Sequence, residues 1–398
     1  MYSVIAYDNF SVMDRGIGED DMKRASCLVE TRYPTADHVV ADYNVLDFGA
    51  DPEGLRDSTA AIQSALDTAA AEGAGTVWMP AGTYVLTDTV TVPPYCSLRG
   101  DWRDPDTEGA DYGTVIEVRT EPGLWGPCCF LIWGCTCISG LTFYWPLQNM
   151  DNPIPYNYAI SMPGASLGLT GYMMATIENI TLLNAYKGIG LSITDKTGRC
   201  RDGRFPHDMV AVRHIKGSPL YRGFVNTNND DHSSAEDLNF NSSYWASAGE
   251  RYHAPRAEAI QACHTNCHGV HRSGYHEIFG IPAEGQNYSQ YAMADVGDSV
   301  IRRHEVLLLA DGVRNEHFHR NGAYMLSTFC KVRSGNVHMM NNVVDNCASW
   351  GYHCYAPGKD AQVLVQNAQQ YNGTLTHGNI RSVNRKMIDW RPEWNNRL

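Results

Sequence analysis

A short polar stretch at 226–232, Asn-Thr-Asn-Asn-Asp-Asp-His, holds the residue types that acid–base chemistry needs. Asp230 and Asp231 supply two adjacent carboxyl groups, and His232 follows them. A carboxyl group with a raised pKa can donate a proton while an ionised neighbour activates water. Consecutive Asn and Asp residues also favour turns, in which their side chains bond backbone N–H groups. The stretch therefore predicts either a general acid and base or an Asx-rich corner with a structural role only.

A second group of candidates, rich in Cys and His, lies at 263–277. His268 can bind a sugar hydroxyl or tune a carboxyl group, the group as a whole can bind zinc, or its members can simply pack. The spacing from Cys263 to Cys267 lacks the paired Cys-x-x-Cys of common zinc sites. We therefore expect no metal and no other cofactor.

Aromatic residues at 244–252 are suited to the wall of a sugar-binding cleft. Tyr and Trp rings stack on the apolar faces of sugars and carry a polar group as well. The alternative is an aromatic pair packed beneath a long loop. Together with the polar stretch, these residues give a predicted substrate-binding set: Asn226, Asn228, His232, Trp245, Arg251, Tyr252 and Glu277.

The elements that must position these side chains begin in the stretch 43–100. The sequence predicts a strand at Val45–Phe48, a turn with Gly and Pro, and a helix over 57–72 that Asp57 or Ser58 caps. The helix has one apolar stripe at helical spacing, and several short strands follow it. The stripe consists of Ile62, Ala65, Leu66 and Ala69.

Beyond Gly113, a pattern of the form apolar–x–x–apolar–x–apolar recurs. Copies lie at 138–143, 177–182 and 235–240, with weaker copies at 212–215 and around Val337. A strand repeat interrupted by inserted loops is typical of a β-solenoid, whose coils stack roughly 4.8 Å apart. We expect the strand that precedes Asp230 to lie in register with Ile177–Leu183 in the coil beneath it.

The stretch 43–100 resembles the N-terminal motif of the pectate-lyase superfamily of right-handed parallel β-helices, which includes the polygalacturonase-like glycoside hydrolases. The resemblance implies an all-β fold, a single-stranded right-handed parallel β-helix, with an N-terminal helix that covers the first coil and its open sheet edge. The superfamily holds hydrolases, lyases, epimerases and phage tailspikes, so the motif is specific for the fold and not for the reaction. The matching residues are Val45, 47–50, Gly54, 57–63, 65–66, 75–77, 80–84 and 98–100.

The catalytic pattern of the polygalacturonases is matched in part. That family has Asn-Thr-Asp, then Asp-Asp about one coil later, then Gly-His-Gly and Arg-Ile-Lys. Here Asn228 stands where the family has the Asp of Asn-Thr-Asp, and the Asp pair follows two residues later instead of one coil later. Cys-His-Gly at 267–269 matches only the last two residues of Gly-His-Gly. The stretch Arg213–Lys216 resembles the last motif but lies upstream. We take Asp230, Asp231 and His268 as the candidate catalytic residues.

The sequence divides into an N-terminal arm at 1–42, a β-helix at 43–375 and a C-terminal cap or tail at 376–398. The net charge of −13 disfavours nucleic acid, and no apolar run approaches the roughly 20 residues of a membrane helix. We expect neither partner, and a homo-oligomer is compatible with the sequence. No signal peptide is evident, which favours a cytoplasmic location, or secretion if a leader was removed. Most of the twelve cysteines are expected to be free and buried, with some disulfides as the alternative.

The leading hypothesis is a carbohydrate-active enzyme that cleaves the glycosidic bonds of a poly- or oligosaccharide by carboxylate acid–base hydrolysis. Such enzymes hold two carboxyl groups about 5–9.5 Å apart, a spacing that neighbouring strand positions provide. The alternative is a lyase or epimerase on the same fold, which removes the proton next to a uronic carboxylate. A third hypothesis is a non-catalytic, glycan-binding or tailspike-like module.

Overall fold

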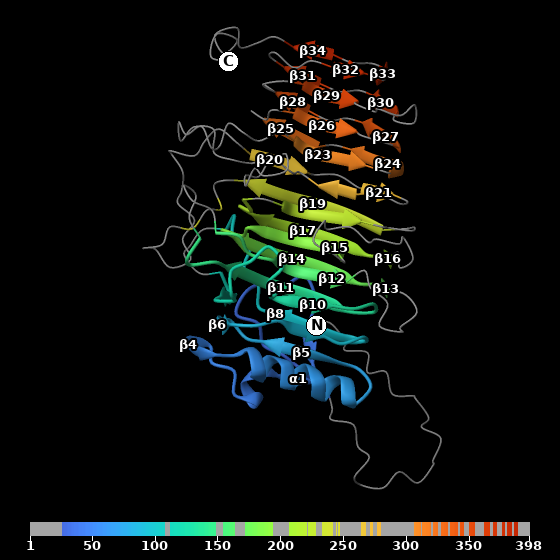
Figure 1. The fold of residues 1–398 in the computed structure, drawn as a ribbon. Helices are drawn as coiled ribbons and strands as arrows, with labels where there is room; N and C mark the ends of the chain where they lie inside the picture. The colour runs from blue at the N-terminus through green and yellow to red at the C-terminus, as the bar shows by residue number, and fades with distance from the viewer. Residues whose placement is uncertain are drawn as a thin grey trace, which may run out of the picture.

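In the computed structural model, strands wind around one axis into a stack of three-sided coils, a parallel β-helix (Figure 1). The N-terminal coils and the helix α1 (Thr59–Ala71) lie at one end of the stack, and the C-terminal coils lie at the other. The structure describes residues 26–107, 112–148, 154–163, 172–193, 207–220, 222–227, 233–241, 244 and 246, and beyond these only the strands from β20 onward given below. The architecture expected from the sequence is confirmed.

Sheet 1 is a ten-stranded face of the solenoid. Its strands are parallel except around β22, which pairs antiparallel with both of its neighbours. In spatial order they are β7 (Val90–Val92), β10 (Phe130–Ile132), β12 (Tyr158–Pro163), β15 (Lys187–Ile193), β18 (Arg222–Thr227), β22 (Glu277–Phe279), β23 (Val306–Asp311), β26 (Thr328–Val332), β29 (Trp350–Cys354) and β32 (Thr376–Gly378).

Sheets 2 and 3 are the other two faces, and four long strands run across both of them. These shared strands are β11 (Cys137–Tyr144), β14 (Thr176–Leu183), β17 (Ala211–Gly217) and β19 (Ser233–Asn241). Sheet 2 adds β3 (Tyr43–Asn44), β5 (Gly75–Met79), β8 (Cys96–Gly100), β21 (His271–Ser273), β24 (Val313–His319), β27 (Gly335–Met340), β30 (Gln362–Gln366) and β33 (Ile380–Val383). Sheet 3 adds β4 (Glu53–Asp57), β6 (Gly82–Leu86), β9 (Thr114–Val118), β20 (His264–Cys267), β25 (Asn321–Tyr324), β28 (Val343–Asp345), β31 (Gln369–Tyr371) and β34 (Lys386–Ile388).

The repeated apolar pattern forms the columns of the interior. Ile138 pairs with Ile177, and Ile177 with Val212, so that the same position of each coil faces inward. All three side chains are fully buried. Parallel pairing in register stacks equivalent side chains directly above one another. Each apolar side chain is thereby shielded from water by the equivalent side chains of the neighbouring coils. The sequence repeat and the structural coil are therefore the same unit.

A left-handed bend separates sheet 2 from sheet 3 within each long strand. The residue at the bend is Gly140, Asn179, His214 or Asp237, with φ between 53° and 74°. Each is the second variable residue of the repeated pattern, and Gly, Asn and Asp enter this conformation most readily. At Gly140 the coils also approach closely, because an added Cβ would lie 2.3 Å from the carbonyl oxygen of Gly100.

The helix α1 (Thr59–Ala71) covers the first coil at the N-terminal end (Figure 1). The predicted stripe is confirmed, since Ile62, Ala65, Leu66 and Ala69 are the buried residues of the helix. The side chain of Gln63 takes up backbone hydrogen bonds at the free edge of β7. The Thr91 N–H donates to Gln63 Oε1 at 2.7 Å, and the Thr91 carbonyl accepts from Gln63 Nε2 at 3.1 Å. The helix thus occupies the open edge of sheet 1, where a further chain could otherwise pair.

One predicted strand at the N-terminus is wrong. Residues Val45–Phe48 form a 3-10 helix, η2, which follows the two-residue strand β3. The side chain of Asn44 caps it by accepting from the Leu46 N–H at 3.0 Å, and Gly49 ends it with φ at 90°. A four-residue stretch with three apolar residues fits either conformation, and the Asn44 cap and Gly49 favour the 3-10 helix.

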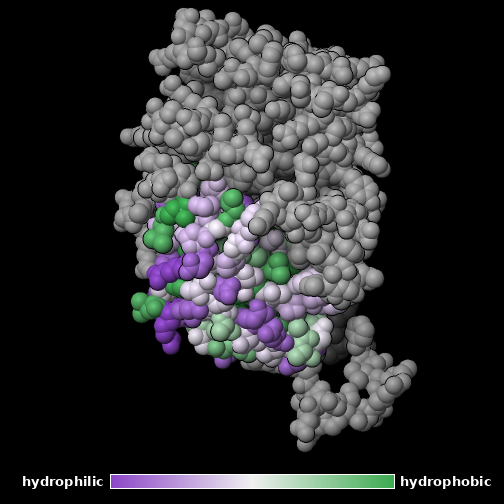
Figure 2. Space-filling model, viewed as in Figure 1, coloured by the Kyte–Doolittle hydropathy of each residue, from purple (hydrophilic) through white to green (hydrophobic). Residues whose placement is uncertain are grey.

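The described part of the N-terminal arm lies against the first coils of sheet 2. Strands β1 (Cys27–Leu28) and β2 (Val40–Ala41) pair antiparallel, and Val39 and Ala41 pack on the buried Trp78. Hydrophilic and hydrophobic side chains are interspersed over the N-terminal coils on the face that Figure 2 shows. Among the described residues no helix is both long and apolar enough to cross a bilayer. Among the cysteines between residues 26 and 148, Cys96, Cys128 and Cys129 are buried, Cys135 and Cys137 are half-buried and Cys27 is exposed, and none of these six forms a disulfide.

One coil runs around the axis in the reverse sense. The chain passes from β20 in sheet 3 to β21 in sheet 2 and then to β22 in sheet 1, and each of these strands pairs antiparallel with its neighbours on both sides. This coil is an antiparallel exception within the otherwise parallel β-helix. An antiparallel ladder satisfies the backbone N–H and C=O groups as well as a parallel one, so the stack continues beyond the reversed coil.

Candidate functional site

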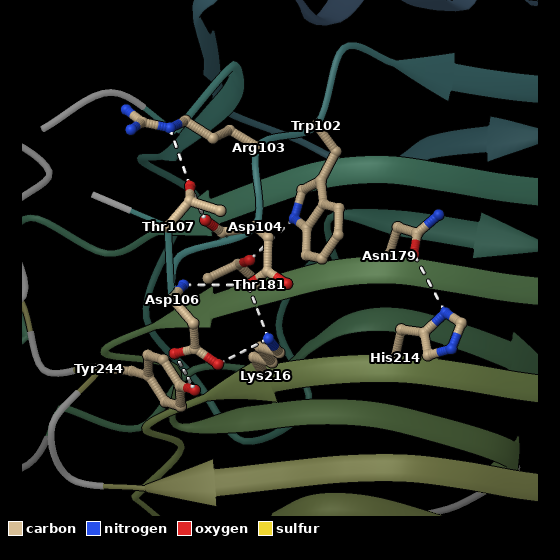
Figure 3. A network of polar contacts seen from close by, with 10 residues as sticks. All are labelled: Trp102, Arg103, Asp104, Asp106, Thr107, Asn179, Thr181, His214, Lys216 and Tyr244. Atoms are coloured by element: carbon tan, nitrogen blue, oxygen red, sulfur yellow. Dashed lines mark hydrogen bonds and ion pairs between the residues drawn. The ribbon is translucent and has the colours of Figure 1, made fainter. Parts of the chain in front are cut away.

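A loop between β8 and β9 crosses the outer face of sheet 3 and reaches residues several coils away (Figure 3). We call residues 101–107 the strap. Its Trp102 donates from Nε1 to Thr181 Oγ1 of β14 at 3.0 Å. At its start, the carboxylate of Asp101 is buried and accepts the backbone N–H groups of Arg32 and Tyr33, at 2.5 and 3.2 Å. The strap is thus fixed to the arm on one side and, on the other, to β14, which lies two coils beyond β8 and β9.

Lys216 clamps the far part of the strap. Its Nζ lies 2.6 Å from Asp104 Oδ1 and 2.7 Å from Asp106 Oδ2, and only 11% of the lysine side chain is exposed. Burial by itself would lower the pKa of Lys216, but the hydrogen bonds to the two carboxylates outweigh burial and raise that pKa. The lysine is therefore a cation throughout the physiological range, and it holds two residues that lie over a hundred positions upstream.

Tyr244 completes the clamp from the segment after β19. Its hydroxyl donates to Asp106 Oδ1 at 2.7 Å, and the residue is 5% exposed. Burial, together with that hydrogen bond, raises the pKa of Tyr244 well above its usual value. Tyr244 is thus buried against the strap, whereas Trp245, the other member of the predicted aromatic pair, lies outside the described residues. The Tyr244 ring belongs to an outer apolar cluster with Tyr112, Val115, Tyr144, Leu183 and Ala246.

The chemistry available in the clamp follows from these protonation states. Lys216 and Tyr244 both hold their protons, so they can donate hydrogen bonds but do not serve as proton acceptors near neutral pH. Both are already engaged with Asp106. The clamp therefore fixes the strap, and it does so on the outer face of the coils, where Trp102 and Arg103 are half-buried.

A polar pair marks the left-handed bend next to the strap (Figure 3). Oδ1 of Asn179 lies 3.3 Å from Nδ1 of His214, one coil further on, and His214 is exposed. On the sheet 2 side of the bend, Arg213 donates to Glu178 at 2.8 Å. The stretch Arg213–Lys216, which resembles a family motif, is thus β17, with Arg213 and Lys216 in ion pairs and Ile215 in the core.

Two of the predicted substrate-binding positions lie on neighbouring strands, one position out of register, so they face opposite sides of sheet 1. In sheet 1, Asn226 of β18 pairs with Ile278 of β22, and its neighbour Thr227 pairs with Glu277. Asn226 and Glu277 therefore occupy adjacent positions on paired strands. The other predicted site residues lie outside the described residues: Asp230, Asp231, His268, Asn228, His232, Trp245, Arg251 and Tyr252.

The predicted register beneath the acidic pair is wrong. The strand that precedes Asp230 is β18, which stacks on β15 in sheet 1. The position above Ile177–Leu183 belongs to β17 instead. The reason is that each coil crosses three sheets, so successive strands of one coil stack on different columns of the coil below.

The clamp was missed by sequence reasoning because its members come from distant loops and strands. One signal was present: Lys216 stands at an outward position of a strand, with Ile215 beside it in the interior column. A lysine there needs a partner or solvent. Within the described ranges, no group of three or more His, Cys, Asp or Glu residues is suited to a metal ion.

Comparison with known proteins places the N-terminal coils in context. A family model described as "Rhamnogalacturonase A/epimerase, pectate lyase-like" matches residues 43–118. Mannuronan C5-epimerase AlgE5 of Azotobacter vinelandii is 63% identical over 43 residues, which are 11% of this chain and 4% of that protein. Across six such epimerases of that organism, the matched segment spans between 2% and 8% of the relative's length.

Two further likenesses are longer and weaker. Plasmin and fibronectin-binding protein A of Streptococcus pneumoniae is 25% identical over 226 residues, which are 51% of this chain and 31% of that protein. The solved A-module of mannuronan C-5 epimerase AlgE4 of A. vinelandii covers 88% of this chain and 98% of its own, with 15% identity and a TM-score of 0.36. The resemblance stated from the sequence is confirmed where the motif lies: residues 43–118 carry a pectate lyase-like sequence and form the first coils of a parallel β-helix.

Proposed function

We propose that the protein acts on a uronic-acid polysaccharide, as a C5-epimerase or as a β-eliminating lyase. The observation that carries this proposal is the match of residues 43–118 to a pectate lyase-like family whose description includes an epimerase. The 43-residue likeness to mannuronan C5-epimerases supports it. Glycosidic hydrolysis, the leading hypothesis from the sequence, receives no specific support from these comparisons, so the alternative takes its place.

Epimerisation and elimination share their first step. A base removes the proton at C5 of the sugar, next to the carboxylate, and a positive charge or hydrogen-bond donor stabilises the carbanion-like intermediate. An epimerase then returns a proton to the opposite face of C5. A lyase instead expels the substituent at C4, and a double bond forms between C4 and C5.

For the residues that carry the reaction, we keep Asp230, Asp231 and His268 as proposed catalytic residues. In this chemistry a histidine suits the role of base, because its ordinary pKa lies near neutrality. Asn226 and Glu277 stay proposed substrate-binding residues, and the strands that carry them, β18 and β22, pair with each other. The same strand β18 ends at Thr227, the second residue of the polar stretch and three residues before Asp230.

A solvent-isotope experiment separates the reactions. The protein is incubated with polymannuronate and, separately, polygalacturonate in D2O, and the products are examined by NMR, ultraviolet absorbance and a reducing-end assay. Epimerisation places deuterium at C5 without shortening the chain, and elimination produces an unsaturated, absorbing end group. Either result supports the proposal. Reducing ends without deuterium or unsaturation would mean hydrolysis, and an unchanged polymer would mean a binding module; both outcomes refute it.

A further inference from the structure

We propose that one corner of the solenoid is the interface through which two copies of this chain form a parallel dimer. The corner lies where the chain passes from sheet 1 to sheet 2, on the four coils that contain β8, β11, β14 and β17. The two copies are related by a two-fold axis that runs parallel to the stack of coils. The interface does not depend on which reaction the protein catalyses, and its residues include none of the candidate catalytic residues.

A column of uncharged, mostly large and exposed side chains marks this corner on four successive coils, and we call it the ridge. It consists of Tyr95, Cys135, Met174 and Met209. The side chains of Tyr95, Met174 and Met209 are 66%, 55% and 44% exposed, and Cys135 is half-buried. The Tyr95 N–H donates to the Cys135 carbonyl at 3.0 Å, so the column follows the stacking of the coils. Large apolar groups that stay in water on successive coils indicate a surface that another molecule covers.

The ridge residues have a backbone conformation that such side chains rarely adopt. Their φ angles lie between 52° and 64°, in the left-handed region. Glycine and asparagine enter this region most readily, and Gly140 and Asn179 do so at the other bend of the same coils. The ridge therefore departs from two local preferences at once, since its residues are both strained and mostly exposed. Departures of this kind, repeated from coil to coil, point to a function of the surface rather than to the stability of the fold.

A column of small, uncharged residues runs beside the ridge on the outer face of sheet 2, and we call it the small column. Its members are paired in register on consecutive strands, and each is half-buried: Ser97, Cys137, Thr176 and Ala211. Each stands two residues after a ridge residue, and the residue between them is buried. One position further along the same face, Arg99, Glu178 and Arg213 provide a charged border. An uncharged centre with a charged border is the usual composition of a protein interface.

Shape and charge together select a second copy of the chain as the partner. The net charge of −13 makes two copies repel each other wherever charged faces meet, but no residue of the ridge or of the small column is charged. A large column beside a small one is also self-complementary. In a pair with a two-fold axis along the stack, equal coils lie at the same level, and the ridge of each copy rests on the small column of the other. Cys135 of one copy then faces Cys137 of the partner subunit.

The first test measures the mass of the full chain by sedimentation over a series of protein concentrations. The variants are Tyr95→Asn and Met174→Asn, with Leu55→Asn as the matched control, because Leu55 is an 81% exposed apolar residue of β4, outside the corner. Asparagine removes the apolar side chain and favours the left-handed conformation, so the two ridge variants should fold at least as stably as the unmodified protein. The thermal midpoint of each variant checks this.

We expect a dimer that dissociates on dilution, because a contact confined to four coils is small for a specific interface. Tyr95→Asn and Met174→Asn should each raise the dissociation constant about tenfold or more, the usual effect of losing a large apolar side chain that binding buries. Leu55→Asn should dimerise like the unmodified protein. A monomer at every concentration, a trimer, or ridge variants that dimerise as tightly as the unmodified protein would each overturn the interface.

The second test locates the contact and its direction by disulfide trapping. Cys135→Ser and Cys137→Ser are treated with the thiol oxidant diamide, separately and as a mixture, and the products are separated on a non-reducing denaturing gel. Each variant alone lacks one member of the facing pair, whereas a mixed dimer regains one Cys135 opposite one Cys137. The mixture should therefore give more disulfide-linked dimer than either variant alone. Equal yields in all three samples would refute the parallel arrangement.

Discussion

Lys216 and Asp106 are 110 residues apart in the sequence, yet Nζ of the lysine lies 2.7 Å from a carboxylate oxygen of the aspartate. The contact joins the loop between β8 and β9 to β17, which lies three coils further along the solenoid. This side-chain ion pair links several stacked coils in addition to the backbone hydrogen bonds between their strands. In a solenoid, where each coil otherwise contacts its neighbours only, such a contact couples coils that are not adjacent.

Replacing Lys216 by Gln is expected to loosen the strap. The two carboxylates would lose their cation, and the destabilisation should be about 1–2 kcal/mol, since Asp104 and Asp106 are partly exposed and solvent screens the pair. Hydrogen exchange of the amides in residues 102–107 should accelerate. Arg99→Gln is the control, because it breaks an ion pair with the largely exposed Asp37 and should cost less than about 1 kcal/mol. Unchanged exchange in the strap would show that the clamp does not hold it.

Alkaline conditions should destabilise the clamp. Tyr244 and Lys216 both have pKa values raised above those of the unfolded chain. Above about pH 10 the unfolded chain loses these protons while the folded protein keeps them, so the free energy of unfolding falls as pH rises. Tyr244→Phe should flatten this fall in denaturant titrations between about pH 9 and 11. A slope identical to that of the unmodified protein would contradict the role of Tyr244, and Tyr95→Phe, which removes an exposed tyrosine, is the control.

Gly140→Ala should be far more destabilising than Gly73→Ala. Both glycines have φ between 70° and 100°, but an added Cβ at Gly73 has no atom within 4 Å, whereas at Gly140 it meets the Gly100 oxygen at 2.3 Å. We expect about 1 kcal/mol at Gly73, from backbone strain, and about 3 kcal/mol or more at Gly140, where the coils must move apart. Thermal unfolding of the two variants measures the difference. Equal thermal midpoints for the two variants would mean that the coils at Gly140 accommodate the added methyl group without moving apart.

Asp230→Asn and Asp231→Asn test the acidic pair on a verified substrate. If these carboxylates carry acid–base chemistry, each change should lower turnover at least about a hundredfold with little effect on the thermal midpoint. Asp67→Asn, on the exposed side of α1, is the control and should leave turnover unchanged. Near-normal turnover in both variants would assign the stretch to a turn. The search would then move to Asp208, Glu236, Glu250 and Glu277.

The sequence by itself determined the periodic features of this protein. The apolar repeat placed Ile138, Ile177 and Val212 at one position of successive coils, and they are in register and buried. The stripe on α1 was equally readable, as was the family motif of the first coils. These features are local, because a side chain that faces the core repeats at the period of its own strand or helix.

Tertiary structure alone decided how distant polar residues meet. Nothing in the sequence around Asp104 and Asp106 indicates Lys216 or Tyr244, and nothing near Asn226 indicates that Glu277 lies on the next strand. Such pairs depend on which column each strand occupies, on the path of the strap across several coils and on the reversal of one coil. Those choices are made by the stacking of the whole solenoid, in which a single change of register moves every outward side chain to a new partner.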